Sequence, residues 1–143
     1  YAKLADAFTP LAKGMNSEYC NQNAYDCIQI HGGSGFMLEY ACQRIYRDTR
    51  ITSIYEGTTQ LQVVAAIRYA TNGFYSTLLD EYLSAEVSQA MSPVRDRIAK
   101  MVDSYRAAVE RAQSFGCQDT NDFLSRRIYE MASYCIMTPL CSK

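Results

Sequence analysis

Apolar side chains recur at three- and four-residue intervals through the first 31 residues, which is the spacing of one face of an α-helix. The only strong helix breakers inside this stretch are Pro10 and Gly14. The pattern therefore predicts one long helix over residues 2–31 and leaves open an interruption near Pro10. The segment HGGSGF, residues 31–36, ends the helix, because its three glycines can adopt the positive φ angles of a helix stop and a tight turn.

A second helical region follows the glycines. Residues 38–47 predict a short helix, and DTRITSIYEGT, residues 48–58, predicts a connection. Thr58 or Thr59 can cap the next helix, because a threonine hydroxyl accepts a hydrogen bond from a free N–H of the first turn. The segment ATNGF then ends that helix.

The second half of the chain carries three further helical patterns. Residues 74–90 predict a short, modestly amphipathic helix, and Ser92 and Pro93 provide an N-cap and a first helical position for the next one. Its apolar stripe consists of Val94, Ile98, Met101, Val102, Tyr105, Ala108, Val109 and Ala112. After the break SFGCQDTND, apolar residues from Phe123 to Ile136 predict a last helix.

No stretch sustains the alternation of apolar and polar residues that a half-buried β-strand requires. The fold class is therefore predicted to be all-α, an antiparallel helical bundle with short loops and additional C-terminal helices. We divide the chain into a helical bundle over residues 1–73 and a helical extension over residues 74–143.

Composition and charge argue against several classes of function. A hydrophobic content of 48% suffices for a buried core, and a formal net charge of −1 does not suggest a nucleic-acid partner or an anionic membrane surface. No apolar run is long enough to span a bilayer and no signal peptide opens the chain, so we expect no membrane association.

The chain contains six cysteines: Cys20, Cys27, Cys42, Cys117, Cys135 and Cys141. None belongs to a C-x-x-C pair and His31 is the only histidine, so the usual spacing of a zinc site is missing and we expect no metal site. Cys20 and Cys27 would share a helix face, which favours two small buried apolar residues over a disulfide. This use of cysteine favours a reducing, intracellular compartment.

Taken singly, the polar motifs have ordinary interpretations. GGSGF lacks the lysine of a nucleoside-triphosphate loop and follows a helix rather than the strand of a dinucleotide loop. His31 alone is typical of a packed or capping histidine, and RDTR, residues 47–50, is typical of a solvated salt-bridge patch. Glu56 alone is typical of an exposed carboxylate near a helix N-terminus.

Together, these motifs are far more specific. Residues 29–62, QIHGGSGFMLEYACQRIYRDTRITSIYEGTTQLQ, contain in order the elements Q-I-x-G-G-x-G-[FY], E-Y, R-D and I-Y-E-G-T-x-Q-[IL]-Q. This series resembles the C-terminal signature of the acyl-CoA dehydrogenase family and implies the C-terminal four-helix bundle of a flavoenzyme. Because the chain starts with Tyr1 rather than methionine, directly at a predicted helix, we expect a fragment of a longer polypeptide whose flavin-binding domains precede it.

The resemblance implies roles for individual residues. Glu56 matches the family's catalytic base, Gly57 matches a substrate-contacting position, and Tyr55 is expected to line the acyl pocket. Arg47 and Asp48 are expected to be structural residues that position the loop before Glu56. The positions that match family contacts with FAD are Thr58, Thr59 and Gln60, together with Gln29, Ile30, His31, Gly32 and Gly33 for the FAD of a neighbouring subunit.

The implied activity is FAD-dependent α,β-dehydrogenation of an acyl-CoA to the trans-2-enoyl-CoA, as in fatty-acid β-oxidation, with hydride transfer to flavin N5 and an electron-transfer flavoprotein as acceptor. We expect the parent to be a homodimer or homotetramer in the bacterial cytoplasm, or in the mitochondrial matrix of a eukaryote, and the isolated chain to be inactive. Two alternatives remain: a flavin-dependent acyl-CoA oxidase, and a non-enzymatic helical oligomerisation or interaction module. The extension resembles those of longer bacterial acyl-CoA dehydrogenases, and packing or oligomer contact is favoured for it over membrane docking.

Overall fold

The computed structural model describes residues 1–84 and 92–141. Every regular element among them is a helix, which confirms the predicted all-α class. The chain divides into two compact units, Tyr1–Val63 and Val64–Lys143, so the boundary falls inside helix α4 (Thr59–Thr71). The predicted division at residue 73 stays a prediction. None of the described helices is both long and apolar enough to cross a lipid bilayer.

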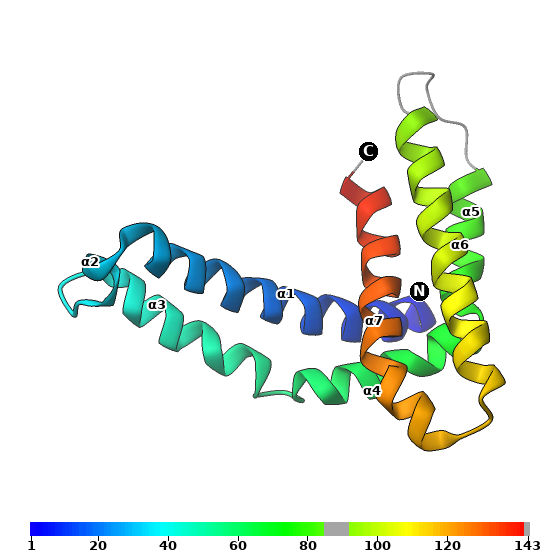
Figure 1. Ribbon diagram of the computed structural model, residues 1–143, viewed down its shortest axis with the longest axis horizontal. Helices are drawn as coiled ribbons and strands as arrows, with labels where there is room; N and C mark the ends of the chain where they lie inside the picture. Colours follow the sequence, from blue (N-terminus) through cyan, green and yellow to red (C-terminus); the bar gives the residue numbers. More distant parts are fainter. Residues whose placement is uncertain (85–91, 142–143) are drawn as a thin grey trace. The chain divides into compact units, whose positions relative to one another are not determined.

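The first unit is an antiparallel helical hairpin (Figure 1). Helix α1 (Ala2–His31) extends along the whole length of this unit, and the chain then turns back through α2 (Gly33–Phe36). Helix α3 (Ala41–Arg50) then lies beside α1, and one 3₁₀ turn, η1 (Ile51–Ser53), follows it. The predicted long helix is confirmed, and it continues through Pro10 without interruption.

Two details of this unit differ from the sequence expectation. The short helix covers Ala41–Arg50 rather than residues 38–47, because Met37 and Tyr40 are extended and the N–H of Tyr40 closes a turn on the carbonyl of Met37 (3.2 Å). The cysteines of α1 were expected to be buried, but Cys20 is exposed and Cys27 is only half-buried. Periodicity places residues on a helix face, but it does not say how far along the helix a partner covers that face.

In the second unit, helices α5 (Phe74–Ser84), α6 (Ser92–Ser114) and α7 (Gln118–Cys141) pack against one another (Figure 1). The end of α4 and the positive φ of Gly73 (81°) confirm the predicted helix stop in ATNGF. Residues 85–90 of the predicted helix over 74–90 lie outside the described residues.

The core of this unit consists of the predicted stripe of α6 and several tyrosines. Ile98, Val102, Tyr105, Val109 and Ala112 of α6 are all buried, which confirms most of that stripe. Tyr105 is fully buried, and burial raises the pKa of its phenol above the ordinary range. Its hydroxyl has no hydrogen-bond partner in the described part of the chain. Burying an unpaired hydroxyl costs free energy, so Tyr105 is a site where the core is not optimal.

Candidate active site

The turn between η1 and α4 contains Glu56, and its backbone is unusual. The N–H of Tyr55 donates to the carbonyl of Ile51 (3.0 Å), and the next two residues, Glu56 and Gly57, have φ angles of 52° and 89°. Among the described residues, Glu56 is the only non-glycine residue with a positive φ. This conformation costs an L-residue about 1–2 kcal/mol, so contacts from elsewhere must hold the turn.

Two side chains hold the carbonyls of this turn. The ammonium of Lys13 on α1 donates to the carbonyl of Gly57 (2.6 Å), and Nε2 of Gln62 on α4 donates to the carbonyls of Glu56 (3.3 Å) and Gly57 (3.4 Å). A Cβ at Gly57 would lie 2.8 Å from Nε2 of Gln62, so glycine leaves the space that this amide occupies. The strained backbone is therefore fixed through its carbonyls.

Lys13 belongs to a polar stripe on α1 that sequence reasoning missed. Four and eight residues further along the helix, the hydroxyl of Ser17 donates to the carbonyl of Thr52 (3.0 Å), and Nδ2 of Asn21 donates to the carbonyl of Thr49 (3.2 Å). The sequence does contain a signal for this stripe, which is the four-residue spacing of three polar residues in an otherwise apolar pattern. Residues at this spacing share one face of a helix. These contacts connect α1 to the end of α3 and to the turn that carries Glu56.

The start of α4 confirms the predicted threonine cap. The hydroxyl of Thr58 accepts a hydrogen bond from the N–H of Leu61 (3.3 Å). The hydroxyl of Thr59 is buried and donates to a carboxylate oxygen of Glu18 on α1 (2.6 Å), so its hydrogen is already engaged within the chain. Of the three positions that match FAD contacts here, Thr58 and Gln60 are exposed and Thr59 is not.

The side chain of Glu56 is exposed, and nothing in residues 1–84 or 92–141 forms a hydrogen bond or ion pair with its carboxylate or its N–H. Tyr55 beside it is half exposed, and the ammonium of Lys13 lies 5.9 Å from the centroid of its ring. The turn thus presents a free carboxylate and a free backbone donor side by side. Any removal of Glu56 from water must come from a group that binds over this turn.

The second predicted segment lies where α1 ends. Gly32 stops the helix with a φ of 59°, and its N–H donates to the carbonyl of Gln29 (3.2 Å). Gln29, Ile30, His31, Gly32 and Gly33 are all exposed, and no atom lies within 4 Å of a Cβ built on Gly32 or Gly33. An open glycine backbone of this kind fits the close approach of a large polar group such as FAD.

The structure keeps these two segments apart within one chain. Lys13, which holds the Glu56 turn, and Gln29 are separated by 16 residues of the same helix, or about 24 Å at 1.5 Å per residue. The Glu56 turn and the glycine segment therefore form two separate surfaces. The assignment of the glycine segment to a neighbouring subunit's FAD stays a prediction.

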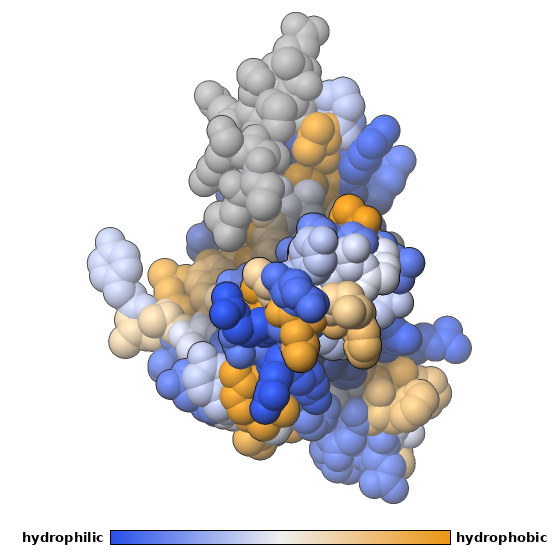
Figure 2. Space-filling view, turned by 90° about the vertical axis from the view of Figure 1, so that its left-hand side faces the viewer, coloured by the Kyte–Doolittle hydropathy of each residue, from blue (hydrophilic) through white to orange (hydrophobic). Residues whose placement is uncertain are grey.

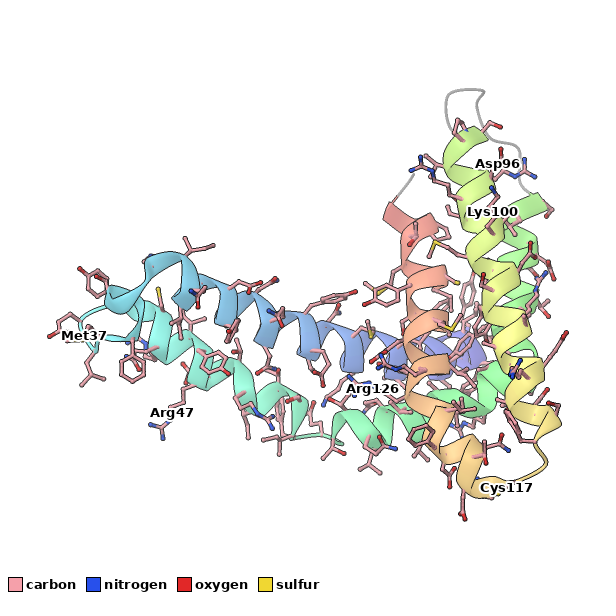
Figure 3. All side chains as sticks on the ribbon, viewed as in Figure 1. Met37, Arg47, Asp96, Lys100, Cys117 and Arg126 are labelled. Atoms are coloured by element: carbon pink, nitrogen blue, oxygen red, sulfur yellow. The ribbon has the colours of Figure 1, made fainter. Side chains whose placement is uncertain are left out.

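Large apolar side chains surround the glycine segment. Ile30, Phe36 and Leu38 are 83%, 77% and 84% exposed. Met37 lies at the end of this unit where the chain turns from α1 to α3 (Figure 3). Figure 2 faces this end and shows hydrophobic side chains among hydrophilic ones. Clustered large apolar side chains at this level of exposure are typical of a surface that another protein segment covers.

The positioning role expected of Arg47 and Asp48 stays a prediction. Both are exposed, and neither side chain makes a hydrogen bond or ion pair with another residue in the described segments. Arg47 points away from α1 (Figure 3). Among the described residues, the polar stripe of α1 makes the contacts that hold the loop.

Two family models match successive parts of the chain. The model described as "Acyl-CoA dehydrogenase, C-terminal domain" matches residues 2–69, and the model described as "Acyl-CoA dehydrogenase C terminal" matches residues 71–142, half of the chain. The chain belongs to the acyl-CoA dehydrogenase family. The first match contains both the Glu56 turn and the glycine segment, and the second covers most of the helical extension.

Several curated proteins are similar to a part of the chain. The caffeyl-CoA reductase-Etf complex subunit CarC of Acetobacterium woodii is 50% identical over 60 residues, which cover 42% of this chain and 16% of CarC. The mitochondrial long-chain specific acyl-CoA dehydrogenase of Sus scrofa is 46% identical over 59 residues, which cover 41% of this chain and 14% of that enzyme. The acryloyl-CoA reductase (NADH) of Anaerotignum propionicum is 41% identical over 75 residues, which cover 47% of this chain and 18% of that enzyme.

This acyl-CoA dehydrogenase family chain spans less than a fifth of the length of the curated relatives it matches. No solved structure matches it.

Proposed function

We propose that the chain is the C-terminal helical part of an FAD-dependent oxidoreductase of the acyl-CoA dehydrogenase type, in which Glu56 removes the α-proton of an acyl-CoA thioester. The observation that carries this proposal is the Glu56 turn. Its strained backbone is held by Lys13 and Gln62, while the carboxylate and N–H of Glu56 have no partner in the described residues. Backbone strain at a residue whose polar groups have no partner is typical of a functional site.

The chemistry makes two demands that this turn can meet. A thioester α-proton is weakly acidic, so the base needs a site shielded from water, and the negative charge that develops on the thioester oxygen needs a hydrogen-bond donor. The carboxylate of Glu56 would take the proton, and its backbone N–H would donate to the thioester oxygen. Gly57 lets the substrate approach the backbone, and Tyr55 would line the acyl chain.

FAD, when bound, supplies the acceptor for the β-hydrogen as hydride. In this chain Thr58 and Gln60, at the exposed start of α4, would contact it, because the first N–H groups of a helix suit phosphate oxygens. The residues Gln29–Gly33 would contact the FAD of a neighbouring subunit. Thr59 would contribute through its backbone or its oxygen lone pairs, since its hydroxyl hydrogen is given to Glu18.

The proposed direction is oxidation of a saturated acyl-CoA to a trans-2-enoyl-CoA in fatty-acid degradation. A second candidate, reduction of a 2-enoyl-CoA, is favoured by the relatives named as caffeyl-CoA and acryloyl-CoA reductases. Glu56 serves both directions, because the group that removes the α-proton in one direction returns it in the other. Electron-transfer flavoprotein is the proposed redox partner, and CarC is named as a subunit of an Etf complex.

The exposed apolar residues around the glycine segment support a homodimer or homotetramer, in which a second copy would cover them. We propose the bacterial cytoplasm, or the mitochondrial matrix of a eukaryote, as the location. No membrane or nucleic-acid partner is included in this proposal, because a formal net charge of −1 favours neither.

The test is Glu56→Gln in the parent polypeptide that carries this chain together with its flavin domains. The substitution keeps the backbone N–H and removes the base, so single-turnover reduction of flavin by acyl-CoA should slow by at least about a hundredfold. Glu110→Gln, an exposed carboxylate on α6, is the matched control and should reduce at the normal rate.

The other outcomes of this experiment separate the alternatives. Near-normal flavin reduction in Glu56→Gln removes Glu56 from the mechanism. Rapid peroxide formation without an acceptor flavoprotein indicates an acyl-CoA oxidase. A separate observation, a parent polypeptide that lacks flavin-binding domains, would indicate the helical interaction module.

A further inference from the structure

Three potential metal ligands meet where α1 ends and α3 begins. Cys27 and His31 lie four residues apart in the last turns of α1, and Cys42 is the second residue of α3. One ligand atom from each of the three side chains lies within 4.8 Å of the other two. The separation is 3.5 Å between the sulfurs of Cys27 and Cys42, and 3.9 Å between the sulfur of Cys27 and Nδ1 of His31.

We propose that Cys27, His31 and Cys42 form a binding site for a divalent cation of the zinc class, which prefers thiolate and imidazole ligands. The proposal does not depend on the oxidoreductase activity proposed above. No metal site was expected from the sequence, because no C-x-x-C spacing is present. The antiparallel pairing of α1 with α3 brings in the third ligand from 15 residues away, which no local spacing rule detects.

The separations fit ligands of one ion better than a disulfide. Around a tetrahedral zinc ion, with Zn–S of about 2.3 Å and Zn–N of about 2.0–2.1 Å, neighbouring ligand atoms lie roughly 3.5–3.8 Å apart. The 3.5 Å separation between the sulfurs of Cys27 and Cys42 is close to these values. A disulfide requires the sulfurs to approach to about 2.05 Å. A bridging cation therefore needs no closer approach of the two sulfurs.

The histidine is already oriented as metal-binding histidines usually are. Nδ1 of His31 lies 2.9 Å from the backbone carbonyl of Cys27, and a carbonyl can only accept, so Nδ1 carries the hydrogen. The lone pair is then on Nε2, and the ring is fixed by a backbone contact of the kind that orients metal ligands. The last turn of α1 also carries the negative end of its helix dipole, which attracts a cation.

The three side chains of the cluster differ in solvent exposure, which increases from Cys42 through Cys27 to His31. Cys42 is 7% exposed, Cys27 is half-buried and His31 is exposed. The cation would thus enter from solvent past His31, and the fourth coordination position would be open to water. Bound there, the cation would clamp α1 to α3 directly before the glycine turn and would fix the chain reversal at residues 32–40.

The test uses the 143-residue chain, fully reduced and stripped of metal. Titration with Co²⁺ should give one ion per chain, with the thiolate-to-cobalt charge-transfer absorption and the visible d–d absorption of a tetrahedral site. Zn²⁺ should displace Co²⁺ and raise the thermal midpoint of the chain, because it binds only the folded state. His31→Gln and Cys42→Ser should each weaken Zn²⁺ binding by at least about a hundredfold, since even an outer partner of a metal ligand is worth 10–100-fold.

Cys20→Ser is the matched control, because Cys20 is an exposed cysteine on the same helix but lies outside the cluster. It should bind Zn²⁺ as the unsubstituted chain does. His31→Gln changes an exposed side chain, so a loss of binding in this variant, with unchanged circular dichroism, cannot be attributed to unfolding. The proposal is overturned if Cys20→Ser and Cys42→Ser weaken binding equally. It is also overturned if the fully reduced chain gives no thiolate–cobalt absorption.

Discussion

Replacing Lys13 by Met tests whether the Glu56 turn is held from α1. Methionine keeps an unbranched apolar side chain of similar length and removes the ammonium that donates to the carbonyl of Gly57 at 2.6 Å. The same ammonium lies 5.9 Å from the centroid of the Tyr55 ring, so both contacts are lost together. We expect the turn to open more often while the helices remain intact.

The size of the effect follows from the contacts that remain. A hydrogen bond that involves a charged group contributes about 1.5–3 kcal/mol. The Lys13 contact is only part-buried, and Nε2 of Gln62 still donates to the same carbonyl (3.4 Å), so Gly57 is not left unpaired. A loss of about 1 kcal/mol is therefore expected, which is roughly a fivefold increase in the opening equilibrium. The positive φ of Glu56 adds a tendency to relax once the anchor is gone.

Native-state hydrogen exchange measures this opening directly. The N–H of Tyr55 donates to Ile51 and the N–H of Gln62 donates to Thr58, so both amides should exchange about fivefold faster in Lys13→Met. Lys100→Met is the control, because Lys100 is exposed on α6 and its ammonium has no acceptor in the described residues (Figure 3). Unchanged exchange at Tyr55 and Gln62 in Lys13→Met would refute the claim that α1 holds the turn.

Two further predictions concern the second unit. Tyr105→Phe removes a buried hydroxyl that lacks a partner in the described residues, so the free energy of unfolding in urea should rise by about 1 kcal/mol; a decrease would show that the hydroxyl is satisfied. The exposed thiol of Cys117 lies at the start of α7 (Figure 3). Hydrogen bonds from the backbone and hydroxyl of Thr120 and from the backbone of Asp119 lower the pKa of this thiol. Burial, in contrast, raises the pKa of the Cys135 thiol to about 11. A lower pKa means more thiolate at a given pH, so iodoacetamide should modify Cys117 before Cys135. The plot of the Cys117 modification rate against pH should have its inflection below the usual thiol pKa. Thr120→Val should move that inflection to higher pH, because it removes one of the hydrogen bonds to the thiol. Equal modification rates across pH 6–9, roughly the range around ordinary thiol titration, would contradict this assignment.

Helix positions were largely readable from the sequence because their signals are local. The glycine stop at Gly32, the cap at Thr58 and the stop at Gly73 each depend on a few consecutive residues, and the structure has all three. The start of α3 was misplaced by three residues, because the extended turn before it leaves no mark in a 3.6-residue pattern. Family membership was also readable, since the signature of residues 29–62 is an ordered series of residue types.

The contacts around the candidate site were not readable in the same way. Lys13 reaches Gly57 across 44 residues, and Cys27 approaches Cys42 only because α3 folds back along α1. Such pairs depend on the register between two helices and on side-chain rotamers, neither of which periodicity specifies. The sequence by itself determined the helices, the caps and the identity of Glu56 as the candidate base. Only the tertiary structure decided that the Glu56 backbone is strained and held from α1, and that two cysteines and the single histidine meet at the end of that helix, because both follow from pairing residues distant in the chain.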